Sequence, residues 1–236
     1  MEIIYKAIVG SKMHGLDTPE SDEDVRIVYK KPLRLIISPF ANDSSPSLKE
    51  ESFELRHFAK LLTSGNPTVY EVIKSPLCSE DENSIKLKSL MNYAFDCKKI
   101  LYAHIGYAES QIIRYLRVLY GLDESKWQIN TLKRTPKAIV ASYRVLAQCK
   151  QLLTSGDFEP KVKDYNVYLH DMLMDIKTMN LDKIDKPFIK MHLLSLEEEI
   201  FRLKEFFDTI PVEIKNKKAN VFAIEDILMD FYTKQI

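Results

Sequence analysis

Two neighbouring stretches decide the fold: Gly10-Ser11-Lys12-Met13-His14-Gly15 and Ser21-Asp22-Glu23-Asp24-Val25-Arg26. The first follows the apolar, β-branched run Ile3–Val9, which predicts a buried strand ending in a glycine turn. The second leads into Val25–Tyr29, which predicts another strand. Gly10 and Ser11 can present backbone N–H groups and a hydroxyl to a phosphate, because glycine lets an anion approach the main chain. Gly10, Ser11 and Lys12 are therefore candidate phosphate-binding residues.

Acidic residues stand close to this turn in the sequence. On a strand, Asp22 and Asp24 would point to the same face, where two carboxylates repel each other unless a cation lies between them. Oxygen ligands of this kind suit Mg²⁺, or Mn²⁺, which fills its other positions with water and substrate phosphate. Arg26 shares the face and is a candidate phosphate contact. His14 is the histidine nearest the turn and a candidate contact for a phosphate or base.

A two-metal site needs a further carboxylate, which we expect from a neighbouring strand. The segment Leu48–Phe53 predicts that strand and contains Glu50 and Glu51. If Leu48 faces the core, Glu51 faces the open side, so we predict Glu51 as the third metal ligand and catalytic acid, with Asp22 and Asp24. A shift of one residue would exchange Glu51 for Glu50.

The rest of the chain divides into a mixed part and a helical part. Leu33–Ile37 predicts a short strand within a proline-containing loop, and Leu55 onward predicts a helix that stops at Gly65. Asn66 and Pro67 then predict a turn into a short helix, with no need of a ligand. From about Ser84 the apolar spacing is helical, and we predict helices at Thr135–Gly156 (Thr135 as N-cap), Tyr165–Met179, Pro187–Phe207 and Asn220–Tyr232. The predicted fold is α+β: a small mixed-sheet core over residues 1–83 and a helical domain over 84–236.

Composition narrows the function classes. The 34 basic and 34 acidic residues give a net charge of zero, which argues against polybasic coating of nucleic acid. Three widely spaced cysteines argue against a disulfide framework or a thiolate zinc site and favour a reducing cytoplasm. Lys6 interrupts the N-terminal apolar stretch, and no apolar run approaches the roughly 20 residues of a membrane span. We therefore expect a cytoplasmic protein without a membrane partner; composition leaves its oligomeric state open.

One segment is locally basic. Residues 114–150 contain eight basic and two acidic residues, a net charge of +6, together with Tyr115, Tyr120, Trp127 and Tyr143. Such a segment can hold an RNA or DNA end, with Arg134, Lys137 and Arg144 as candidate contacts. The alternative is that the charges only solvate helices and the aromatic rings are core.

The motifs resemble the nucleotidyltransferases of the DNA polymerase β superfamily. Within it, the chain is similar to a bacterial and phage group of predicted nucleotidyltransferases linked to RNA repair. The resemblance spans roughly residues 5 to 175 and includes Gly10-Ser11 with Gly15, Thr18-Pro19-x-Ser21-Asp22-x-Asp24-x-Arg26, Leu55-Arg56-x-Phe58, Gly65-Asn66-Pro67-Thr68-Val69-x-Glu71, Gly106-Tyr107-Ala108-x-Ser110-Gln111, Lys137-Ala138, Arg144 and Leu153-x-Ser155-Gly156. It implies a small mixed sheet, a helical C-terminal domain and Mg²⁺-dependent nucleotidyl transfer from a nucleoside triphosphate.

The chain also departs from that group. Ile27 stands where the group usually has a glycine, and Lys49 where it often has an aspartate. The acceptor implied by the resemblance is an RNA 3′ end, such as that of tRNA, with release of pyrophosphate. A protein or small-molecule hydroxyl is an alternative acceptor, and a degenerate transferase acting as a binding module is an alternative function.

Overall fold

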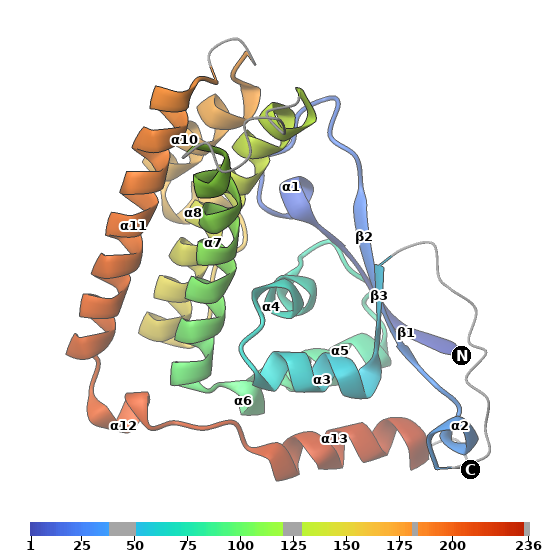
Figure 1. Ribbon diagram of the computed structural model, residues 1–236. Coiled ribbons are helices and arrows are strands. Elements are labelled where there is room, and N and C mark those ends of the chain that lie inside the picture. Colours follow the sequence, from blue (N-terminus) through green and yellow to red (C-terminus); the bar gives the residue numbers. More distant parts are fainter. Residues whose placement is uncertain (38–50, 120–128, 181–183, 234–236) are drawn as a thin grey trace. The chain divides into compact units, whose positions relative to one another are not determined.

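The computed structural model describes residues 1–37, 51–119, 129–180 and 184–233. These residues form two compact units (Figure 1). One contains residues 1–99 and 217–236, and the other contains residues 100–216. The first unit is thus closed by the C-terminal segment of the chain.

The first unit is built on a sheet of three strands among the described residues. Its order is β1 (Glu2–Val9), β2 (Asp24–Lys30) and β3 (Glu51–Glu54). β1 and β2 are antiparallel and β2 and β3 are parallel, so the sheet is mixed, as predicted. The predicted start of the third strand, residues 48–50, lies outside the described residues.

Helices cover one side of this sheet. α3 (Leu55–Thr63) and α4 (Pro67–Lys74) lie on the same side, where Tyr5 and Val28 are fully buried (Figure 1). α5 (Glu82–Ser89) packs against β1. Gly65 has φ 78°, which suits a helix end, and the Asn66 side chain caps α4 through the N–H of Thr68. The predicted stop and turn between α3 and α4 are confirmed.

The C-terminal helix α13 (Val221–Thr233) completes this unit. It packs against α3 and α6 (Met91–Ala94), and Asn220 caps it through the N–H of Ala223. The buried Lys30 at the end of β2 donates to the Phe231 carbonyl at 2.8 Å. The Phe231 ring is 3% exposed, and Lys86 Nζ lies 5.0 Å from its centroid. Residues far apart in the chain therefore share one core.

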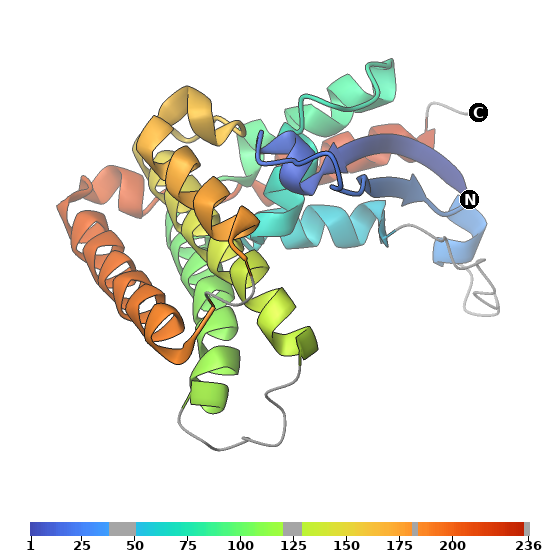
Figure 2. The same cartoon turned by 90° about the horizontal axis from the view of Figure 1, so that it is seen from above.

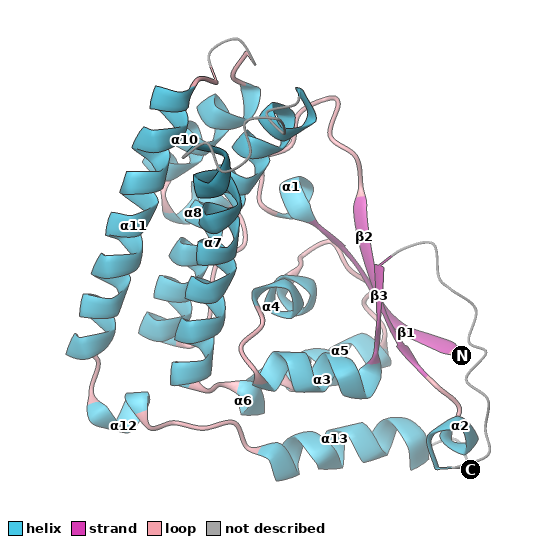
Figure 3. Ribbon diagram, in the orientation of Figure 1, coloured by secondary structure: helices cyan, strands magenta, loops and turns pink. Residues whose placement is uncertain are grey.

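The second unit is helical and has no strand among its described residues (Figure 3). It contains α7 (Cys97–Leu119, from residue 100), α8 (Ile129–Ser155), α9 (Val162–Tyr165), α10 (Val167–Thr178), α11 (Lys186–Thr209) and α12 (Val212–Lys215). α8 packs against α10 and α11, and α7 runs beside α8 (Figures 1 and 2). Gly156 ends α8 with φ 77°, as predicted. No helix in the described part of the chain is long and apolar enough to cross a membrane.

Two predicted elements are wrong. Leu33–Ile37 is a helix, α2, and not a strand. The Pro32 carbonyl accepts the Leu35 N–H at 2.9 Å, so this short apolar run forms a helical turn where no partner strand pairs with it. α8 begins at Ile129 rather than at a Thr135 cap and contains Pro136. Thr135 and Pro136 are both buried within α8, although the proline supplies no N–H to the helix.

The compact units and the predicted domains do not divide the chain at the same residues. The units divide after Lys99 and again after Asn216, whereas the sequence predicts a domain boundary after residue 83. α5, α6 and α13 belong to the unit that contains the sheet. A division of the chain into domains 1–83 and 84–236 stays a prediction.

Phe231→Ala tests the contribution of α13 to the first unit. Removing a buried ring leaves a cavity, so we expect the free energy of unfolding to fall by about 3–5 kcal/mol. Phe222 on the same helix is 81% exposed, and Phe222→Ala should change stability by less than about 0.5 kcal/mol. Urea denaturation followed by circular dichroism measures both; equal effects would contradict the role of α13 in this core.

His192 predicts a pH dependence in the helical unit. Burial lowers the pKa of His192. The centroid of its ring lies 4.5 Å from that of the Phe188 ring. His192 in the unfolded chain therefore binds a proton near pH 6.5, whereas His192 in the folded chain binds it only at lower pH. Protonation thus favours the unfolded chain, and the free energy of unfolding decreases as pH falls below about 6.5. The slope from this group is at most about 1.4 kcal/mol per pH unit. Comparing urea midpoints from pH 7.5 to 5.5, we expect His192→Gln to show a shallower loss than the unmodified protein.

Candidate active site

The turn after β1 has the conformation that the sequence predicts. Gly10 begins the one-turn helix α1 (Gly10–Met13) with φ 70°, and Gly15 has φ 64°. A Cβ on Gly10 would collide with the Asp24 carboxylate. The close approach of Asp24 to the main chain therefore requires a glycine at this position.

Strand pairing places Asp24 at this turn. Val9, the last residue of β1, pairs with Asp24, the first residue of β2. Asp24 is exposed to solvent, and so is Asp22. Because β2 begins only at Asp24, the expectation that Asp22 and Asp24 share a strand face does not hold. Asp22 lies in the irregular segment that precedes the strand.

Arg26 and Glu51 are neighbours across the parallel pair of strands. Arg26 pairs with Glu51 in the backbone register of β2 and β3. Arg26 is half-buried, and the structure describes Glu51 by its backbone only. Glu50 and Lys49 lie outside the described residues. This register places Glu51 beside β2, the strand that contains Asp24. The role of Glu51 as the third metal ligand stays a prediction.

Glu54, the acid that follows this strand, has a structural role. Its carboxylate caps α3 by accepting the His57 N–H at 3.3 Å, and it also accepts from Arg56 Nε at 3.1 Å. The Tyr232 hydroxyl lies 3.4 Å from the same carboxylate, and the pKa of Tyr232 is raised to about 12 by burial and by Glu54. These contacts direct Glu54 to the start of α3 and to α13.

Lys12 lies on the exposed side of the turn. Its ammonium forms an ion pair with Glu23 at 3.0 Å, and both side chains are partly exposed. Surface pairs of this kind contribute little to stability, so Lys12 can exchange Glu23 for another anion at low cost. Ser11 is half-buried, and its carbonyl accepts the Leu16 N–H at 2.9 Å.

His14 points inward, contrary to its proposed contact with a phosphate or base. His14 is 2% exposed, and its Nε2 lies 3.7 Å from Oε1 of Glu71 on α4. Glu71 is itself buried, with 7% of its surface exposed. Sequence reasoning missed this pair. The available signal was a single acid, Glu71, within the otherwise apolar stretch of α4 from Val69 to Ile73.

The candidate nucleic-acid contacts lie on α8. Arg134 and Lys137 are exposed and Arg144 is half-buried, at spacings that place them on one broad helix face. Tyr143 is 7% exposed and belongs to the core of the helical unit, so it is not available for stacking. Tyr120 and Trp127 lie outside the described residues.

Comparison with known proteins decides the family. The model of RlaP, the RNA repair pathway DNA polymerase beta family, matches residues 1–216. The chain belongs to this family. Membership supports a nucleotidyltransferase-like role and agrees with the mixed sheet and helical region described above.

One curated relative of this RlaP-family chain comes from a phage. The "Uncharacterized 38.9 kDa protein in nrdC-mobD intergenic region" of Enterobacteria phage T4 is 26% identical over 135 residues. The match covers 49% of this chain and 39% of the phage protein, so the chain spans well under two thirds of that relative's length. No solved structure matches the chain.

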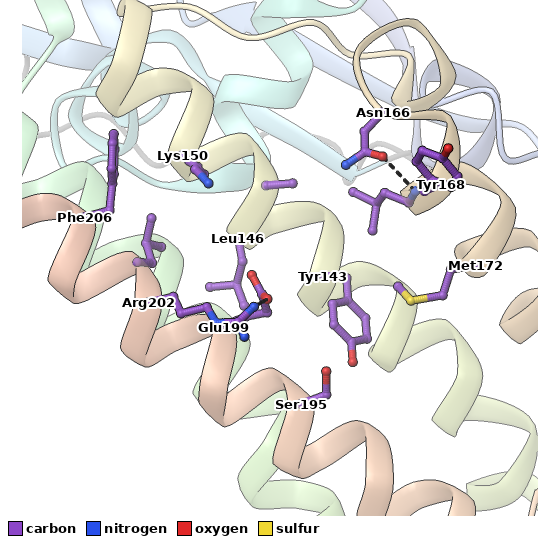
Figure 4. A pocket seen from close by; sticks show the side chains of 13 residues that line it. Tyr143, Leu146, Lys150, Asn166, Tyr168, Met172, Ser195, Glu199, Arg202 and Phe206 are labelled. Carbon is purple, nitrogen blue, oxygen red and sulfur yellow. Dashed lines mark hydrogen bonds and ion pairs between the residues drawn. The ribbon is translucent and has the colours of Figure 1, made fainter.

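The helical unit of the RlaP-family chain also contains a pocket that the sequence did not predict. It has a volume of about 480 Å³ and lies between α8, α10 and α11 (Figure 4). Tyr143, Leu146 and Phe206 supply much of its apolar lining. The positive charges come from Lys150 and from Arg202, which pairs with Glu199 at 3.1 Å and with Glu198 at 2.6 Å. Glu199, which also lines the pocket, thus offsets the charge of Arg202.

Comparing two glycine variants separates backbone strain from the collision with Asp24. Both Gly10 and Gly15 have positive φ, but a Cβ on Gly15 meets nothing within 4 Å. We expect Gly15→Ala to cost about 1 kcal/mol of stability and Gly10→Ala to cost more, because the Asp24 carboxylate must also move. Urea unfolding measures the difference, and equal costs would show that Asp24 does not depend on Gly10.

Proposed function

We propose that the chain transfers a nucleoside monophosphate from a nucleoside triphosphate to a hydroxyl at an RNA 3′ end, with release of pyrophosphate. The observation that carries this proposal is the placement of Asp24 against the side-chain-free Gly10, at the start of the Gly10–Gly15 turn. Family membership supports the reaction class. The same arrangement supports a site that brings a triphosphate close to carboxylates.

The residues present fit a divalent metal ion in their chemistry. Asp22 and Asp24 are exposed carboxylates with the oxygen ligands that Mg²⁺ or Mn²⁺ prefers. Among the described residues, no group of three His, Cys, Asp or Glu side chains is placed to hold a metal by itself. The side chain of Glu51 lies outside this description, and we assign it with Asp22 and Asp24 as the ligand set on the family's reaction class, with substrate phosphate completing the set. The bound metal would neutralise charge on the reacting phosphate and acidify the attacking hydroxyl.

The chain's own residues bind and orient the triphosphate. Backbone N–H groups at Gly10 and the Ser11 hydroxyl hold the β- and γ-phosphates, and Lys12 exchanges its exposed pairing with Glu23 for a phosphate. Arg26 contributes positive charge from the adjoining strand. Holding the α-phosphorus in line with the acceptor hydroxyl converts a bimolecular reaction into an effectively intramolecular one.

The basic segment, residues 114–150, supports an RNA end as the acceptor. Arg134 and Lys137 are exposed on α8 and suit an RNA backbone. RNA repair in the family description supports RNA over a protein or small-molecule hydroxyl. A cytoplasmic location, where RNA ends are accessible, belongs to the same proposal.

Asp24→Asn tests the transferase directly. The protein is incubated with each α-³²P-labelled nucleoside triphosphate, Mg²⁺ or Mn²⁺, and total RNA plus protein. We expect label in RNA with the unmodified chain and a loss of roughly a hundredfold or more in Asp24→Asn, since a first-sphere ligand matters at least as much as the groups behind it. EDTA should abolish the signal.

Glu20→Gln is the matched control for this experiment. Glu20 is an exposed acid in the segment between α1 and β2 and has no part in the proposed site. It should retain the labelling of the unmodified protein. Label that persists in Asp24→Asn, or that appears in protein instead of RNA, would contradict the catalytic site or the acceptor respectively.

A further inference from the structure

A buried contact between a histidine and a glutamate connects the Gly10–Gly15 turn to α4. His14 is the C-cap of α1, and its Nε2 lies 3.7 Å from Oε1 of Glu71. The side chains are 2% and 9% exposed, so water screens the pair little. Neither residue belongs to the catalytic set proposed above.

The Glu71 end of this contact is attached to the sheet. α4 is held to β1 by a hydrogen bond from the Tyr5 hydroxyl to the Val72 carbonyl, at 3.1 Å. The chain just after α4 is held as well, because Ser75 Oγ donates to the Ile8 carbonyl at 2.5 Å and the Ile8 N–H donates to Leu77 at 2.8 Å. Glu71 therefore has a fixed position relative to the strand that leads into the turn.

The His14 end is attached to the residues that face the proposed phosphates. The His14 N–H donates to the Gly10 carbonyl at 3.3 Å, and the Leu16 N–H donates to the Ser11 carbonyl at 2.9 Å. His14 is therefore hydrogen-bonded directly to Gly10, and its near neighbour Leu16 to Ser11.

Stability alone does not account for the pair. Met13 and Leu16 on either side of His14 are 0% and 2% exposed and already anchor the turn by apolar burial. Burying an acid and an imidazole costs desolvation, and an apolar pair of similar size would stabilise the fold about as well. The contact between His14 and Glu71 joins one side of the turn to one place on α4, which apolar burial alone does not specify.

We propose that His14 and Glu71 are positioning residues that hold the Gly10–Gly15 turn in the orientation that receives the triphosphate. The turn's ligand rests on the function proposed above, whereas the mechanical coupling of the turn to α4 does not. The pair acts through Gly10 and Ser11 and does not touch the substrate.

Amide hydrogen exchange tests the coupling without any need for activity. We expect Glu71→Gln and His14→Gln each to raise exchange at residues 11–16 roughly tenfold, the effect of losing one contact of about 1.4 kcal/mol. The double variant should exceed neither single variant by more than about twofold, because the two residues act as a unit. Two different single variants guard against misfolding of either one.

Lys30→Gln is the matched control. Lys30 is 7% exposed and pairs with Glu2 at 3.2 Å, so it is also a buried residue with an acidic partner. It is the last residue of β2, whereas Asp24 is the first. It should lower global stability and leave exchange at residues 11–16 unchanged. The proposal would be overturned if Lys30→Gln raised exchange at residues 11–16 as much as the His14 and Glu71 variants do. It would also be overturned if neither of those variants raised exchange, or if their effects added in the double variant.

Steady-state kinetics of nucleotidyl transfer supply the second readout. We expect kcat/KM for the nucleoside triphosphate to fall about tenfold in Glu71→Gln and His14→Gln, mainly through KM, with Lys30→Gln close to the unmodified protein. An unchanged KM alongside raised exchange would overturn the link to the triphosphate. If the unmodified chain transfers no nucleotide, the proposed function fails, and the exchange experiment still decides whether the pair holds the turn.

Discussion

The antiparallel pairing of β1 with β2 is the constraint on which the rest of the site depends. Its register sets Val9 opposite Asp24, so the glycine that follows β1 meets the first acid of β2. A slip of one residue would turn every side chain of β2 to the other face and would separate Asp24 from the turn. The register is held by the buried side chains along the same strands, among them Tyr5, Ala7 and Val28.

The turn between these strands has two sides with different tasks. Its inward residues, Met13, His14 and Leu16, are buried and hold it to the unit. Lys12 and Gly15 stay accessible, and Asp22 and Asp24 beside them are exposed. Exposed carboxylates cost little before a ligand arrives, because water screens their repulsion. A rigid inner side and a solvated outer side are what a triphosphate site requires, since the donors must be held in position while the site remains open.

Local sequence signals predicted several strands and helix ends that the structure also contains. The strands around residues 3–9 and 25–29, and the helix ends at Gly65 and Gly156, follow from periodicity and from glycine's access to positive φ. The same signals failed at Leu33–Ile37, an apolar run too short to distinguish strand from helix, and at Pro136, which lies inside α8. At Leu33–Ile37 no described strand pairs with the apolar run, none of its side chains is buried, and the Leu35 N–H donates to the Pro32 carbonyl within the same turn. At Pro136 the helix continues through a residue that more often begins one. The structure brings Gly10 and Asp24 together, as the sequence predicts, whereas the roles of the site residues stay predictions and the contact between His14 and Glu71 was not predicted.

The sequence by itself determined the chemistry available to this protein: a glycine turn after one strand, acids at the start of the next, and an oxygen-rich set of side chains suited to a hard cation. Residue type and spacing carry that information, because strand geometry converts spacing into position. The tertiary structure alone decided that His14 faces Glu71 rather than a ligand, that Glu54 caps a helix, and that α13 returns to cover the unit containing the sheet. Each of these depends on contacts between residues distant in the chain, and such contacts are selected by the packing of the whole core.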